Sequence, residues 1–203
     1  LIVLHQGAWG ERPVDTLTSP ALQKWAHDHG AQILLARTPK GIEPGPESTF
    51  LFSNGCGDLL EGILDSEGLP NLTHAERSKP VLLICTNGKR DQCCANFGRS
   101  LITQCQEALS PDMYGQILEC SHLGGHRFAP TAIWLPENLV LGRLEADAVS
   151  DLLEHGVIDS QYIRGDTKLT PAQQVVQAFV WPQEITFRSC EQFGNDFHID
   201  ALV

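Results

Sequence analysis

The chain has 203 residues, 42% of them hydrophobic, with a formal net charge of −11 and an isoelectric point near 5. That is enough for one large domain or two small ones with a buried core. The acidic balance argues against nucleic acid as the main partner, because phosphate binding requires a basic surface, and no apolar run is long enough to span a membrane.

The first 76 residues predict a small α/β lobe. We expect strands over residues 1–6, 31–38 and 48–54, and helices over 19–30 and 56–66. Ser19 can cap the first helix, Pro20 suits its first position and Gly30 suits its exit. A polar stretch at 68–80 then separates this lobe from a second set of elements.

The second set predicts a thioredoxin-like fold. The run VLLIC has little alternation, as expected of a strand buried on both faces. The elements expected after it are a helix, a strand, a hairpin that turns at 136–138 and a helix ended by Gly156, over residues 95–109, 115–122, 131–144 and 145–156. A strand–helix–strand unit followed by a hairpin and a closing helix is the thioredoxin order, in the α/β (α+β) class.

A further helix is expected over residues 170–181, with Thr170 as its cap and Pro171 in first place, and the tail after it reads as partly extended. These patterns divide the chain into an N-terminal lobe at 1–76, a thioredoxin-like domain at 77–180 and a tail at 181–203. Both lobes open with strand–helix–strand, so we expect two related lobes, although no sequence repeat is visible.

Two cysteines flank a basic loop in the stretch CTNGKRDQCCANFG. Cys85 closes the buried strand and Cys94 opens the next helix, so their sulfurs can converge on one rim of the crossover. The helix N-terminus carries partial positive charge, which favours a thiolate. Lys89 and Arg90 add to that charge. This rim therefore predicts a site that holds ionised sulfur.

Two histidines follow the next strand, in the stretch HLGGHR. If that strand is parallel to the first, as a right-handed crossover requires, His122 and His126 reach the same rim as the cysteines. The two glycines between them permit positive φ and a close approach of the backbone to a bulky ligand. Two sulfurs and two nitrogens then meet at one edge of the sheet.

Such a donor set leaves two cofactors open. Zinc accepts two thiolates and two imidazoles, but structural zinc sites usually space their cysteines two to four residues apart. A 2Fe–2S cluster is larger, and one iron can take both cysteines while the other takes both histidines. A Rieske motif is absent, because no second Cys–His pair follows the CSH triplet at Cys120.

The same stretches, together with WLPENLVLGRL, resemble the sucrase/ferredoxin-like family, which includes the fungal actin-patch-distribution proteins and bacterial and plant relatives. The resemblance covers residues 79–180 well and the first seventy residues more loosely. It implies a thioredoxin-like ferredoxin with a 2Fe–2S cluster. The implied ligands are Cys85, Cys94, His122 and His126.

We therefore expect an electron carrier, with protons coupled through histidine, rather than a catalyst with its own substrate. The alternatives are a thioredoxin-fold thiol–disulfide oxidoreductase and a zinc-binding structural module. The sequence does not identify the redox partner protein of such a carrier, nor the roles of Cys93, Cys120 and Arg127.

The cysteine count bears on the compartment. Seven cysteines cannot all form disulfides, which favours a reducing compartment, and we expect the cytoplasm. The sequence begins at Leu1, without methionine, so targeting is not predicted.

Overall fold

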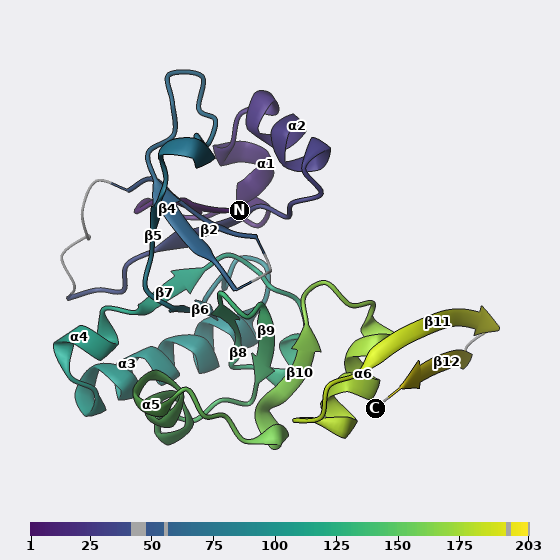
Figure 1. The fold of residues 1–203 in the computed structure, drawn as a ribbon. Helices are drawn as coiled ribbons and strands as arrows, with labels where there is room; N and C mark the ends of the chain where they lie inside the picture. Colours follow the sequence, from purple (N-terminus) through teal and green to yellow (C-terminus); the bar gives the residue numbers. More distant parts are fainter. Residues whose placement is uncertain (42–47, 55–56, 194–195, 203) are drawn as a thin grey trace.

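A computed structural model describes residues 1–41, 48–54, 57–193 and 196–202. Ten of its strands form one sheet in the order β10-β9-β8-β6-β7-β2-β1-β3-β4-β5. Strands β1–β5 belong to an upper lobe and strands β6–β10 to a lower lobe, as oriented in Figure 1. In the described part of the chain, no helix has both the length and the apolar character needed to cross a membrane.

The lower lobe has the thioredoxin-like order that the sequence predicts. Its strands are β6 (Val81–Cys85), β7 (Ile117–Cys120), β8 (Thr131–Leu135) and β9 (Leu139–Gly142). β6 and β7 are parallel, and β8 pairs antiparallel with both β6 and β9, which gives the order β9-β8-β6-β7. Helices α3 (Arg99–Ala108) and α5 (Ala146–His155) cover one face of these strands around a shared core that contains Leu82 and Ile84.

The upper lobe repeats this strand order. Its strands are β1 (Ile2–Leu4), β2 (Leu34–Arg37), β3 (Phe50–Ser53) and β4 (Leu59–Gly62), in the order β2-β1-β3-β4. β1 and β2 are parallel, and β3 is antiparallel to β1 and β4. Between β1 and β2 lie α1 (Pro13–Leu17) and α2 (Pro20–Asp28), and Ser19 accepts a hydrogen bond from the Leu22 N–H, as its predicted capping role requires. The expectation of two related lobes is therefore confirmed in topology.

The two lobes contact each other in two ways, through a pair of hydrogen-bonded strands and through a hydrophobic core between their sheets. The edge is a short antiparallel pairing of β2 with β7, in which Ala36 lies opposite Cys120 and Arg37 opposite Glu119. The face is a hydrophobic core between the half-sheets, to which Ile2, Leu34 and Leu51 contribute from above and Leu83, Leu118 and Ile133 from below. The molecule is thus layered as helix, sheet, sheet, helix (Figure 1).

The remaining elements lie at the margins. They are α4 (Pro111–Tyr114), β5 (Glu76–Arg77), β10 (Ile163–Asp166), α6 (Pro171–Val180), β11 (Thr186–Phe193), β12 (Asp196–Leu202) and the 3-10 turns η1 (Leu72–His74) and η4 (Ser160–Tyr162). The predicted capping by Thr170 is present as a capping box with Gln173. The tail, expected to be partly extended, forms the antiparallel β11–β12 hairpin, which projects beyond α6 in Figure 1.

One predicted element is wrong. The helix expected over residues 56–66 is the strand β4, which pairs with β3, while Cys56 lies outside the described residues. A Cβ atom at Gly62 would stand 3.1 Å from the ring of Phe50, so a larger residue there would require this ring to shift. The domain boundaries at 76/77 and 180/181 stay predictions.

Candidate metal centre

The end of β6 and the turn that follows its loop place the two predicted cysteines side by side. Cys85 is the last residue of β6, and Cys94 begins η2 (Cys94–Gly98), a π-helical turn that leads into α3. Both side chains are fully buried, at the edge of the core between the lobes. Single π-helical turns occur frequently at functional sites, because they shift side chains out of the regular helical register.

Gly98 is the residue that permits this contact. A Cβ atom built at Gly98 would lie 2.1 Å from the carbonyl oxygen of Cys85, closer than any real contact of this kind. The absence of a side chain therefore lets the π-helical turn lie directly against the end of the strand. This close approach brings Cys94 next to Cys85.

His122 completes a group of three metal-competent side chains. It follows β7, and its Nδ1 lies 3.6 Å from the sulfur of Cys94 and 4.0 Å from that of Cys85. The two sulfurs and a nitrogen of His122 all lie within 4.8 Å of one another. Thiolate and imidazole are donors that suit zinc and iron–sulfur clusters. The donor chemistry thus fits either of the two cofactors expected from the sequence.

The two thiols differ in acidity. A hydrogen bond from the Cys94 thiol lowers the pKa of Cys85 to about 6, supported by the backbone N–H groups of Leu123 and Asn87 and opposed by burial. The same hydrogen bond, together with burial, raises the pKa of Cys94 well above its usual value. The metal-free pair therefore holds one negative charge near neutral pH, and a positive metal favours the loss of the second proton.

His126 lies apart from this group. The glycines before it, Gly124 and Gly125, have φ values of 84° and 65°, so the predicted positive φ is present. The His126 side chain is 51% exposed, and its Nδ1 lies 3.4 Å from the carboxylate of Asp91. Asp91 also accepts a hydrogen bond from the backbone N–H of Cys93, which is the main reason that its pKa is lowered. The four-residue ligand set stays a prediction, with three of its members adjacent and the fourth held by Asp91.

Three neighbours had no assigned role in the sequence. Cys120 is fully buried in the inter-lobe core opposite Cys85 in the strand register, and burial raises its pKa strongly, so it is a core thiol in this arrangement. Cys93 is half-buried, and its thiol interacts with Asp91 rather than with the Cys85 and Cys94 pair. Arg127 is exposed on η3 (His126–Phe128).

Sequence reasoning missed a buried polar network next to the centre. Glu119 is only 8% exposed, and its carboxylate accepts hydrogen bonds from the Thr86 hydroxyl at 2.7 Å and from the Arg37 guanidinium at 2.7 and 3.2 Å. A carboxylate inside the otherwise apolar strand ILEC was the available signal, because buried charges are almost always paired. The network ties β2 of the upper lobe to the residue that follows Cys85.

The fold and this centre define a thioredoxin-like α/β protein with a Cys₂His group placed to bind a metal. A family model described as sucrase/ferredoxin-like matches residues 11–169, which is most of the chain. The chain belongs to the sucrase/ferredoxin-like family. No curated protein shows significant sequence similarity to it.

Solved structures similar to part of the chain include a thioredoxin-like [2Fe-2S] ferredoxin from Aquifex aeolicus, with 14% identity, a TM-score of 0.37 and coverage of 44% of this chain and 94% of the ferredoxin. Two cysteine-to-serine variants of that ferredoxin give TM-scores of 0.35 and 0.34, each at 14% identity, with coverage of 42% of this chain and 97% of theirs.

Proposed function

We propose that the chain is an electron carrier that holds a 2Fe–2S cluster through Cys85, Cys94, His122 and His126. The observation that supports this most directly is the convergence of Cys85, Cys94 and His122 within 4.8 Å at the end of β6. Membership of the sucrase/ferredoxin-like family supports the choice of cluster over a single ion. When bound, such a cluster accepts and releases one electron at a time.

The protein's own residues set the surroundings of that electron. The sulfurs of Cys85 and Cys94 lie in the inter-lobe core, where the upper lobe excludes water from them. His122 is only partly buried, and its Nδ1 is the nitrogen that faces the sulfurs, which leaves Nε2 to hold or release a proton. Electron transfer is therefore expected to be coupled to a proton at histidine.

Elemental analysis and spectroscopy test this proposal. Protein purified without oxygen should be coloured and contain about two irons and two acid-labile sulfides per chain. Cys85→Ser and Cys94→Ser should lose the colour, whereas Cys190→Ser, which alters a half-buried thiol on the distant hairpin, should keep it. A colourless preparation that contains only zinc would overturn the cluster and favour a structural zinc module instead.

One observation favours a second function, a thiol–disulfide oxidoreductase. The sulfurs of Cys85 and Cys94 are close, and the pKa of Cys85 is lowered to about 6, as in a reactive thiolate–thiol pair. Full burial of both side chains opposes it, because an attacking thiolate needs access to its substrate. Reduction of a small disulfide by metal-free protein, lost in Cys94→Ser, would select this function over electron transfer.

As its compartment we propose the cytoplasm, because a carrier whose ligands include free thiols depends on a reducing environment.

A further inference from the structure

A cavity lies beside the loop that joins Cys85 to Cys94. It has a volume of about 410 Å³, within the range of pockets that hold small molecules. Both lobes contribute to its wall, which is formed by Ala8, Trp9, Arg37, Thr86, Asn87, Gly88, Lys89, Ala95 and Arg99. None of the described lining residues is acidic, in a chain whose net charge is −11.

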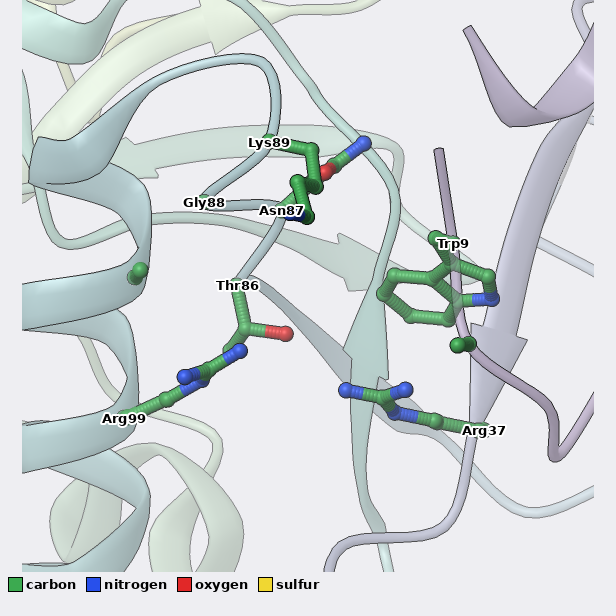
Figure 2. Close-up of a pocket in the computed structure, with 9 residues that line it drawn as sticks. Trp9, Arg37, Thr86, Asn87, Gly88, Lys89 and Arg99 are labelled. Atoms are coloured by element: carbon green, nitrogen blue, oxygen red, sulfur yellow. The ribbon is translucent and has the colours of Figure 1, made fainter. Parts of the chain in front are cut away.

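Three cations face this cavity. Figure 2 shows the guanidinium groups of Arg37, from β2, and Arg99, from α3, pointing toward one another across the space beside Thr86. Lys89 reaches the same cavity from the loop above. Among the residues that the structure describes, neither Arg99 nor Lys89 has an ion-pair partner.

Arg37 is held rigidly in this position. It donates to the carboxylate of Glu119 and to the carbonyl oxygen of Gly7, and its guanidinium lies 4.3 Å from the centre of the Trp9 ring. Glu119 neutralises this one guanidinium from behind the cavity wall, so Arg99 and Lys89 leave a formal surplus of two positive charges. An arginine fixed by several contacts is preorganised, and it loses little freedom when a ligand binds.

Two polar side chains complete the wall. Thr86 and Asn87 are 1% and 3% exposed, and both already donate a hydrogen bond to protein oxygen, to Glu119 and to Gly10 respectively. Guanidinium groups bind carboxylate and phosphate oxygens in paired hydrogen bonds. Arg99 and Lys89 are exposed to solvent, whereas Arg37 is half-buried. The cavity is therefore suited to negative charge carried on oxygen.

We propose that this cavity binds a small molecule with at least two negative charges, carried by phosphate or carboxylate groups, between Arg37, Arg99 and Lys89. The limited volume and the contribution from both lobes favour a small ligand over a peptide or a surface. This inference goes beyond electron transfer and does not depend on the cluster.

Calorimetric titration of the full chain tests the site, with pyrophosphate, inorganic phosphate and citrate as separate probes at constant ionic strength in chloride. We expect saturable binding of pyrophosphate or of citrate, and whichever binds more tightly identifies the source as phosphate or carboxylate. Arg99→Gln should weaken the binding about tenfold, because it removes a pair of charge-assisted hydrogen bonds. Lys89→Gln should weaken it by a smaller factor.

Arg188→Gln is the matched control, since it removes the same charge from an exposed position on β11, away from the cavity. Its affinity should stay within about twofold of wild type, the range expected from general screening alone. Circular dichroism confirms that each variant is folded. The proposal would be overturned if none of the three probes showed saturable binding in the chloride buffer, or if Arg99→Gln and Arg188→Gln lost affinity equally. Either result would count whatever the iron content of the protein.

Discussion

Cys85 and Cys94 share a single proton in the metal-free chain, and this gives a titration that can be measured. Because the hydrogen bond from Cys94 lowers the pKa of Cys85 to about 6, the ultraviolet absorbance of thiolate should rise through about pH 6. Cys94→Ala removes the donor and should move this midpoint upward. The lowered pKa of Cys85 stabilises the folded state most near its unfolded value of 9.0, and this effect is lost as the pH falls through about 6. Above pH 9.0 the raised pKa of Cys94 opposes it, because the unfolded chain then ionises both thiols. No thiolate signal below pH 8 would contradict the assignment.

His126 is the residue at which the proposed ligand set departs most from the observed geometry. If it ligates the cluster, His126→Cys should retain the iron but lower the reduction potential and flatten its pH dependence, because a thiolate adds negative charge and removes a titratable nitrogen. Redox titrations at several pH values measure both effects. His155→Cys, on exposed α5 surface, is the control. Equal pH dependence in wild type and His126→Cys would show that this histidine is not a ligand.

At the scale of elements, the contact between the π-helical turn and β6 sets the distance between the two cysteines. Gly98→Ala places a methyl group against the Cys85 carbonyl and should destabilise the fold by about 1–3 kcal/mol, with a lower iron content. Urea unfolding and iron analysis measure these effects. Gly10→Ala is the control, since its Cβ meets no atom within 4 Å. Wild-type stability and iron content in Gly98→Ala would mean that the turn can move without consequence.

The elements that could be predicted from sequence are those with strong local signals. The run VLLIC, the capped helix at Ser19 and the hairpin near Asn138 were all located correctly. The strand β4 was mistaken for a helix, because Leu59, Leu60 and Ile63 imitate helical spacing while the pairing with β3 is not encoded locally. The π-helical turn was missed for the same reason, since it depends on a tertiary contact.

The candidate site shows the same division. The convergence of Cys85, Cys94 and His122 could be predicted from the sequence. The parallel strands β6 and β7 must end at the same edge of the sheet, which brings the residues that follow them together. The sequence did not predict that Asp91 would lie next to His126, nor that the upper lobe would cover the sulfurs, because both follow from long-range contacts. The pairing of β2 with β7 has no local signature at all.

At the scale of the whole molecule, the ion pair of Arg37 and Glu119 links the lobes through a buried network. Glu119→Gln leaves the partly buried Arg37 guanidinium without its carboxylate and should destabilise the protein by about 1–3 kcal/mol, less than the loss of one partner of a fully buried pair. Chemical denaturation of the full chain measures this, and Asp28→Asn, which breaks the exposed pair with Lys24, should change the stability little. Because the shared core and the continuous sheet couple the lobes, both variants should still unfold in one transition. A Glu119→Gln protein as stable as wild type would show that the core between the half-sheets holds the lobes together without this network.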